Sequence, residues 1–272
     1  MNLIAGFECG LLPWNGHDLL VTTDHVPEGS MKRHYDYAIS QGAVAARDGL
    51  VPGHDIAARL EAAGDIPVIW DMLHYHWPED AHAHGYSVGR ALGRSERPHD
   101  LLLPVNEPSC TIVHGRSVEE ALERGVEVMV AASHHCDAPF VTCDPMHDLR
   151  DETFRATDEL VTTDFIDVIG VNYYPHHASE DLRSILRHVA DRYGKPVFVA
   201  ETSWHEGHPD AIARFPGIGS RRDWWNHVKS ESHASGVEVW GACWYPWIPC
   251  PPWDDPASEE RWPADWQEVE FT

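Results

Sequence analysis

Short apolar runs recur along the chain and are separated by longer amphipathic stretches. This alternation is typical of parallel strands joined by helical crossovers. We expect eight strands, over Leu3–Phe7, Ala43–Asp48, Pro67–Leu73, Leu101–Asn106, Pro139–Cys143, Asp167–Asn172, Pro196–Glu201 and Val237–Trp244. Eight such units predict an α/β fold, a single (β/α)8 TIM barrel. A doubly wound open sheet has the same local pattern and stays open as an alternative.

Helix signals support this interpretation. A helix over Ser117–Ala132 opens with the capping box of Ser117 and Glu120. A second helix over Asp181–Tyr193 is expected to stop at Gly194. The first strand is not followed by the glycine spacing of a dinucleotide-binding fold, which counts against the open sheet.

The chain has 272 residues, which is close to the roughly 250 of a typical TIM barrel. It contains neither an internal repeat nor a low-complexity linker, so residues 1–272 are expected to form one catalytic domain. A Pro- and Trp-rich loop is expected from about residue 249 onward.

The charge of the chain restricts its partners. A formal charge of −24 repels nucleic acid and anionic lipid, so we expect no nucleic-acid or membrane partner. The first ten residues lack the basic region of a secretory signal, and the six cysteines show no C-x-x-C spacing. Reduced thiols in the cytoplasm are therefore expected. The oligomeric state is left open.

Two carboxylates directly follow buried strands. Glu107 comes after the fourth expected strand and Glu201 ends the seventh. The active site of a barrel lies at the carboxyl ends of its strands, and two carboxyl groups about 5–5.5 Å apart there permit glycoside hydrolysis with retention. Arg47, after the second strand, is a candidate to keep Glu201 ionised.

The sequence Asn106-Glu107-Pro108, together with a glutamate on strand seven, resembles the clan A glycoside hydrolases. The segments Gly170-Val-Asn-Tyr-Tyr174 and Val239-Trp-Gly-Ala-Cys-Trp244 resemble the family 1 β-glycosidases more narrowly. The strand order matches over nearly the whole chain, although this chain is much shorter than a usual family 1 enzyme.

The resemblance implies roles for these residues. Glu107 would be the general acid/base and Glu201 the nucleophile. Asn106 would hold the sugar 2-hydroxyl, while Tyr174 and Arg47 would support the nucleophile.

Further sugar contacts are implied at Trp244, as a floor under the ring, and at His74, with His76 as a near rival. Glu8 stands where family 1 enzymes usually present a glutamine. The usual glutamate and tryptophan after strand eight have only a loose match in residues 253–255.

Twenty histidines raise the question of a metal. An H-E-x-x-H spacing is absent, so scattered histidines are the expected interpretation, with no metal and no cofactor. His74 and Asp144 would be the first ligands to suspect.

The predicted function is therefore a retaining β-glycosidase that acts on a small-molecule or oligosaccharide β-glycoside. A catalytically inactive sugar-binding barrel and a metal-dependent hydrolase remain as alternatives.

Overall fold

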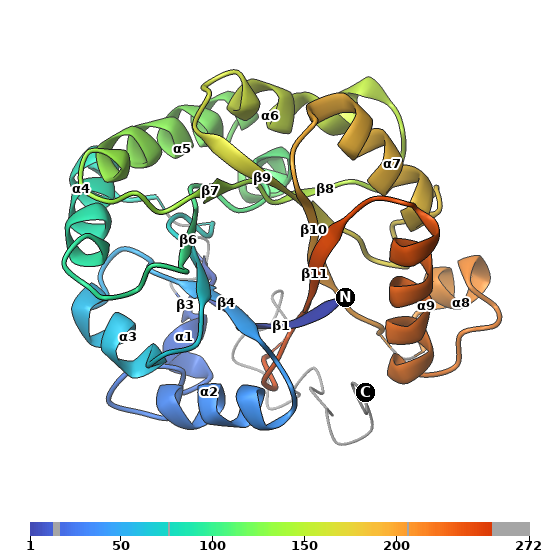
Figure 1. The fold of residues 1–272 in the computed structure, drawn as a ribbon, viewed down its shortest axis with the longest axis horizontal. Coiled ribbons are helices and arrows are strands. Elements are labelled where there is room, and N and C mark those ends of the chain that lie inside the picture. The colour runs from blue at the N-terminus through green and yellow to red at the C-terminus, as the bar shows by residue number, and fades with distance from the viewer. Residues whose placement is uncertain (13–16, 76, 206, 252–272) are drawn as a thin grey trace.

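The computed structural model describes residues 1–12, 17–75, 77–205 and 207–251. In this part of the chain, eight parallel strands form a closed ring inside a circle of helices (Figure 1). The strands of the ring are β1 (Asn2–Gly6), β4 (Ala45–Gly49), β5 (Val68–Asp71), β6 (Leu101–Leu103), β7 (Phe140–Val141), β9 (Ile166–Asn172), β10 (Val197–Thr202) and β11 (Val239–Trp244). β1 pairs with β11 on one side and β4 on the other, and β9 pairs with β10. This closure confirms the TIM barrel and excludes the open sheet.

Helices lie between successive strands, and the longer ones cover the outside of the ring. They are α1 (Leu19–Thr22), α2 (Met31–Ser40), α3 (Ile56–Ala63), α4 (Ala81–Leu92), the 3-10 helix η1 (Pro108–His114), α5 (Val118–Ser133), α6 (Asp151–Val161), α7 (Leu182–Tyr193), α8 (Pro209–Arg214) and α9 (Arg221–Ala234). Two further short strands, β2 (Leu11–Leu12) and β3 (His17–Asp18), form an antiparallel pair. None of the helices in the described residues is long and apolar enough to cross a bilayer.

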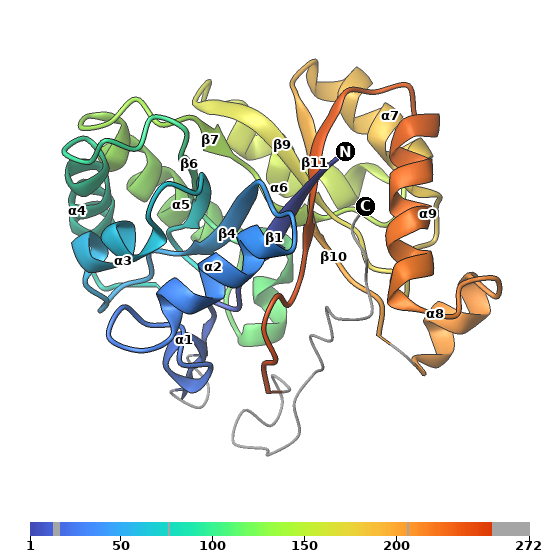
Figure 2. The same cartoon turned by 60° about the horizontal axis from the view of Figure 1, so that its bottom comes forward.

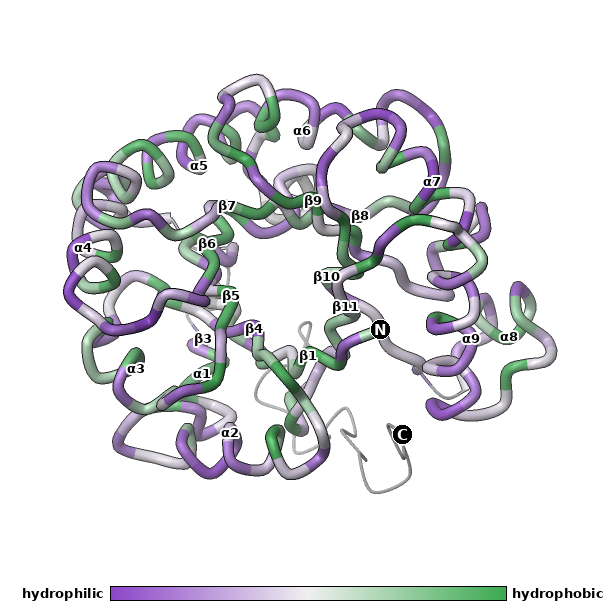
Figure 3. Tube along the Cα trace, in the orientation of Figure 1, coloured by the Kyte–Doolittle hydropathy of each residue, from purple (hydrophilic) through white to green (hydrophobic). Residues whose placement is uncertain are grey.

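Apolar side chains form two main layers. The barrel interior is filled by a cluster that includes Ile4, Ile69, Leu103 and Phe198. A larger cluster lies between the strands and the surrounding helices. Figure 3 shows the strands as mostly hydrophobic and the helices as alternating between polar and apolar positions. Burial of apolar surface on both sides of the ring is the main force that holds it together.

Helices α4 and α5 pack with their backbones in close approach. A Cβ atom added to Gly85 would lie 2.4 Å from the Val128 carbonyl oxygen, and one added to Gly89 would lie 2.5 Å from that of Ala132. The two glycines are one turn apart on α4, so they create a flat strip against which α5 can lie.

The helix signals in the sequence are confirmed. Ser117 precedes α5, and its side chain accepts a hydrogen bond from the Glu120 N–H. Gly194 ends α7 in the left-handed conformation, with φ of 61°.

Strands three, four and five are shorter than expected, and β5 ends at Asp71 rather than Leu73. β6 ends at Leu103 because Pro104 has no N–H to donate. The chain nevertheless continues beside its neighbours, since the Asn106 N–H donates to the Leu73 carbonyl at 2.9 Å. Strand five appears as β7 and β8 (Asp144–Pro145), which flank Cys143.

The carboxyl ends of the strands define one end of the barrel. α1 follows the short strands after β1, and α8 follows β10, so both belong to this end. Figure 2 shows α1 and α8 along the lower edge of the view, where the strands end. The predicted site residues lie at this end. Beyond residue 251, the predicted Pro- and Trp-rich loop falls outside the described residues.

Candidate active site

Two buried carboxylates define the site. Glu201 is on β10 and Glu107 follows β6, and their exposed fractions are 4% and 7%. Glu107 has a φ of 43°, in the left-handed region, which costs a glutamate about 1 kcal/mol or more. Its N–H donates to the Cys143 carbonyl at 2.9 Å, which helps to hold this conformation. The backbone therefore fixes where the Glu107 side chain begins.

Two neutral donors hold the Glu107 carboxyl group. The Tyr75 hydroxyl donates to Oε2 at 2.5 Å, and the Asn172 amide donates to Oε1 at 2.6 Å. Burial and the negative charge of Glu201 raise the pKa of Glu107 to about 7, and the two hydrogen bonds oppose that rise. Glu107 is therefore able to carry a proton near neutral pH.

Glu201 has different partners. Arg47 Nη1 lies 2.5 Å from its Oε1, and the Tyr174 hydroxyl donates to Oε2 at 2.7 Å. Charge-assisted hydrogen bonds of this kind stabilise a carboxylate anion. The two glutamates are thus in different electrostatic surroundings, one against neutral donors and the other against a cation.

Arg47 connects three elements of the site. Besides Glu201, its guanidinium donates twice to Asp71, at 3.0 and 2.7 Å, and once to Asn106 Oδ1 at 2.7 Å. A fourth bond reaches the Ala200 carbonyl at 3.1 Å. The rigid fork of the guanidinium therefore fixes the nucleophile candidate relative to strands β4 and β5.

Asn106 continues this network to His74. Because Asn106 Oδ1 accepts from Arg47, its Nδ2 is the atom that faces His74 Nε2, at 3.1 Å. His74 Nε2 must then accept, and His74 Nδ1 donates to Asp71 Oδ2 at 2.8 Å. The tautomer of His74 follows from the orientation of the Asn106 amide.

The structure brings most of the predicted residues together. Glu107, Glu201, Arg47, Asn106, Tyr174 and His74 form the network just described. Glu8 borders it: its carboxylate accepts from the Gly10 N–H and from the Tyr245 hydroxyl. His76 and residues 253–255 lie outside the described residues.

Trp244 is placed differently from the expectation. Cys243 belongs to the cluster inside the barrel, whereas Trp244 belongs to the cluster on the helix side and packs edge-on against Trp225 of α9. Neighbouring residues of a strand point to opposite faces. The aromatic residue of this segment that reaches the site is Tyr245, through Glu8.

Several site residues were not singled out from the sequence. Asn172 ends the expected sixth strand, so the rule that located Glu201 also covers it. Asp71 ends β5, but the expected third strand continued to Leu73 and placed Asp71 inside it. Cys143 Sγ lies 3.2 and 3.0 Å from the Oδ1 atoms of Asn106 and Asn172, and its single S–H can donate to either. Tyr75 lies in a loop with a φ of 62°, and no sequence pattern marks it.

Residues 149–213 match the family model described as Glycosyl hydrolase family 53. The segment contains Asn172, Tyr174 and Glu201. A probable arabinogalactan endo-beta-1,4-galactanase A of Aspergillus tubingensis is 42% identical over 69 residues, 24% of this chain and 19% of that protein. The probable arabinogalactan endo-beta-1,4-galactanase A of Neosartorya fischeri is 25% identical over 180 residues, which are 61% of this chain and 49% of that protein. The matches therefore span between a fifth and a half of these relatives.

Solved structures share the fold. The family 53 catalytic domain of Ignisphaera aggregans superimposes with a TM-score of 0.59 at 17% identity, over 94% of this chain and 88% of that one. The family 1 β-glucosidase of Thermotoga maritima gives 0.59 at 12% identity, over 90% and 86%. Because the fold similarity is the same for both, the sequence match decides between them. It corrects the narrower resemblance from family 1 to family 53.

Proposed function

We propose that the protein hydrolyses β-linked O-glycosides with retention, with Glu107 as general acid/base and Glu201 as nucleophile. The observation that carries this proposal is the unequal environment of the two buried glutamates. Burial and Glu201 raise the pKa of Glu107 to about 7, while Arg47 is paired with Glu201. A neutral acid beside an ionised carboxylate is the arrangement that double displacement requires.

In the first step, Glu201 forms a bond to the anomeric carbon while the bond to the leaving oxygen breaks. Glu107 gives its proton to that oxygen. In the second step, Glu107 takes a proton from water, the water oxygen bonds to the anomeric carbon, and the bond to Glu201 breaks. Both glutamates return to their starting states.

The pair also explains how Glu107 changes role. The charge of Glu201 is one of the causes that raise the pKa of Glu107. That charge disappears while Glu201 is esterified to the sugar, so the pKa of Glu107 falls. Glu107 is therefore protonated when an acid is needed and ionised when a base is needed.

We propose a β-1,4-linked galactan or its oligosaccharides as the substrate class. The support is the match of residues 149–213 to family 53 and the name of the relatives, arabinogalactan endo-beta-1,4-galactanase. Asn106 and Tyr174, at the edges of the carboxylate pair, would contact the sugar. A neutral polymer suits a chain with a formal charge of −24. The six cysteines are free thiols, which supports the proposed cytoplasmic location.

The test is hydrolysis of linear β-1,4-galactan and of a panel of nitrophenyl β-glycosides, with proton NMR of the first anomer released. We expect the β anomer first and reducing ends from galactan. Glu107→Gln and Glu201→Gln should lose galactan turnover while keeping oligosaccharide binding. An α anomer released first, or a fully active Glu201→Gln enzyme, would contradict the mechanism. Sugar binding without turnover by the wild-type protein would instead favour the inactive binding barrel.

A further inference from the structure

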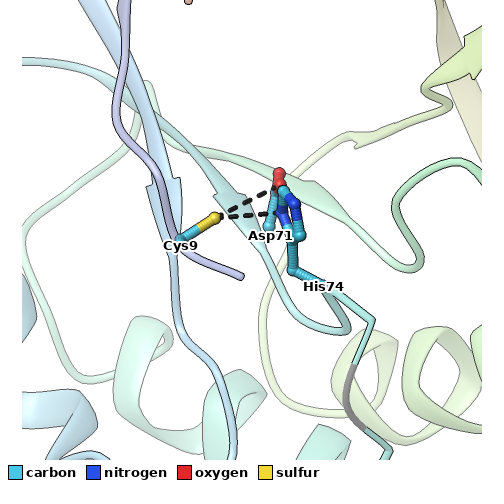
Figure 4. A group of neighbouring side chains, drawn as sticks. All are labelled: Cys9, Asp71 and His74. Atoms are coloured by element: carbon cyan, nitrogen blue, oxygen red, sulfur yellow. Dashed lines mark hydrogen bonds and ion pairs between the residues drawn. The ribbon is translucent and has the colours of Figure 1, made fainter. Parts of the chain in front are cut away.

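Three potential metal ligands meet beside the carboxylate pair. Cys9 follows β1, Asp71 ends β5, and His74 lies in the loop after β5. The Cys9 Sγ atom is 3.1 Å from His74 Nδ1 and 3.6 Å from Asp71 Oδ2, and the last two atoms are 2.8 Å apart. All three side chains are buried. Figure 4 shows the thiol pointing across at the carboxylate and the imidazole, so the three ligand atoms face one another.

The arrangement does not suit a cysteine nucleophile. In a Cys–His–acid triad, the thiol and the acid bind opposite nitrogens of the imidazole. Here both contact Nδ1 of His74. Burial and the negative charges of Asp71, Asp48 and Glu8 also raise the pKa of the Cys9 thiol well above its ordinary value, whereas an activated nucleophile needs a lowered one.

The same features suit a divalent cation. Thiolate, imidazole and carboxylate are the ligands that Zn²⁺ binds, with bonds of about 2.0–2.3 Å. Tetrahedral bonds of that length place ligand atoms roughly 3.3–3.7 Å apart, so the three atoms need to separate by only a few tenths of an ångström. The carboxylates that disfavour a bare thiolate favour a dication that replaces the thiol proton.

A further carboxylate borders the three ligands. Glu8 Oε1 accepts a hydrogen bond from the Gly10 N–H, and Glu8 Oε2 accepts one from the Tyr245 hydroxyl. The negative charge of Glu8 acts on both Cys9 and His74. A water molecule would complete four-fold coordination. Asp144, suspected from the sequence, does not belong to this group; its Oδ1 accepts from Ser109.

We propose that Cys9, Asp71 and His74 form a binding site for Zn²⁺ or a similar soft divalent cation, and that the bound cation inhibits the enzyme. The site is separate from the two glutamates but shares His74 and Asp71 with the network that supports them. The proposal that the cation binds is independent of the proposed function, whereas the proposal that it inhibits the enzyme rests on that function.

The route of inhibition follows from the tautomer of His74. His74 Nε2 now accepts a hydrogen bond from Asn106, and Nδ1 carries the proton. A metal ion on Nδ1 displaces that proton, and the neutral imidazole then carries its proton on Nε2. Two donors, His74 Nε2–H and the Asn106 amide, would then face each other. Because Arg47 holds Asn106 Oδ1, the amide cannot turn without losing that bond, so the support of Glu201 is disturbed.

The test uses Co²⁺ as a spectroscopic substitute for Zn²⁺. Metal-free wild-type protein titrated with CoCl₂ should show a thiolate-to-cobalt charge-transfer band. Zn²⁺ should then displace the Co²⁺ and abolish the band, with one equivalent of Zn²⁺ bound per protein. Cys9→Ser should lose the band and weaken Zn²⁺ affinity by at least about tenfold. The matched control is Cys136→Ser, whose thiol donates to the Ala132 carbonyl at the end of α5; it should keep both. Circular dichroism of each variant checks that it is folded, and Cys9→Ala provides a second variant.

Inhibition is measured separately, as the rate of glycoside hydrolysis with Zn²⁺ divided by the metal-free rate of the same variant. Wild type and Cys136→Ser should be inhibited, and Cys9→Ser should resist the same Zn²⁺ concentration. Absence of a charge-transfer band in the wild type, or Zn²⁺ affinity unchanged in folded Cys9→Ser, would overturn the site. Protein that shows the band but hydrolyses no glycoside would retain the site and refute the proposed function.

Discussion

The side-chain amide of Asn172 donates a 2.6 Å hydrogen bond to Glu107, while the Cys143 thiol donates to the oxygen of the same amide at 3.0 Å. Asn172 ends β9 and Glu107 follows β6, so this bond spans β7, the strand between them, at the carboxyl end of the ring. The thiol fixes which way the amide points. Glu107 therefore receives an N–H rather than a second oxygen.

Removal of the nucleophile should leave a cavity for a small anion. We expect Glu201→Ala to reduce turnover of a nitrophenyl β-glycoside by roughly 10⁴-fold or more. Azide should restore activity by attacking the anomeric carbon from the face that Glu201 occupied, which gives the α-glycosyl azide. The matched variant Glu107→Ala should give the β-glycosyl azide, because Glu201 still forms the covalent intermediate. The anomers are distinguished by NMR, and identical anomers from both variants would show that the roles are misassigned.

The pH profile should respond to the hydroxyl of Tyr75. This hydroxyl donates to Glu107 and thereby lowers its pKa from the value that burial and Glu201 would otherwise set. In wild type, kcat/KM should fall as pH rises through about 7, where Glu107 loses its proton. Tyr75→Phe should move this basic limb to higher pH. Tyr193→Phe, which removes a hydroxyl bonded to Asp158, is the control; a limb that stays in place in Tyr75→Phe would argue against Glu107 as the titrating acid.

Arg47 should be required for stability as well as activity. Its guanidinium is buried between Asp71 and Glu201, at 2.7 and 2.5 Å. Arg47→Met would leave two buried carboxylates without their cation, which costs about 3–5 kcal/mol. Urea unfolding followed by circular dichroism measures the loss. Lys32→Met removes an exposed ion pair with Asp36 and should leave the free energy of unfolding nearly unchanged. Equal losses of unfolding free energy in the two variants would mean that the buried Arg47 network contributes no more to stability than an exposed ion pair.

A group of histidines near the site should make stability depend on pH. His176 packs against His177, His205 and His208, with ring centroids 4.1, 5.4 and 4.7 Å apart. Burial and the neighbouring imidazoles lower the pKa of His176 to about 3, and burial and His208 lower that of His205 to about 4.

The direction of the change in stability with pH follows from the number of protons that each state binds. Because these pKa values lie below the unfolded value of about 6.5, the unfolded chain binds more protons, and stability falls as pH drops from about 6.5 toward 4. His176→Asn should flatten that decline in the melting temperature, and exposed His134→Asn should not. A decline as steep in His176→Asn as in wild type would count against this explanation.

A methyl group added in the contact between α4 and α5 should destabilise the fold. Gly89→Ala would place a Cβ atom 2.5 Å from the Ala132 carbonyl, so we expect a loss of about 1–3 kcal/mol even though alanine favours helices. Gly217→Ala is the control, since a Cβ there meets nothing within 4 Å. Thermal unfolding of both variants measures the difference. A stabilised Gly89→Ala protein would mean that α5 moves away at little cost.

The sequence by itself determined the eight strands, the ends of α5 and α7, and the two glutamates, because each depends on local signals. Apolar runs mark buried strands, Ser117 and Gly194 cap their helices through neighbouring atoms, and Glu107 and Glu201 directly follow apolar runs. Only the tertiary structure decided which strand-end side chains meet. Tyr75 binds Glu107 from a loop with positive φ, Trp244 faces the helices while Tyr245 reaches Glu8, and Cys9 meets Asp71 and His74 across β1, β4 and β5. These contacts depend on the closure of the ring and on the face to which each strand turns its side chains. Both join segments far apart in the chain, so no local sequence pattern determines them.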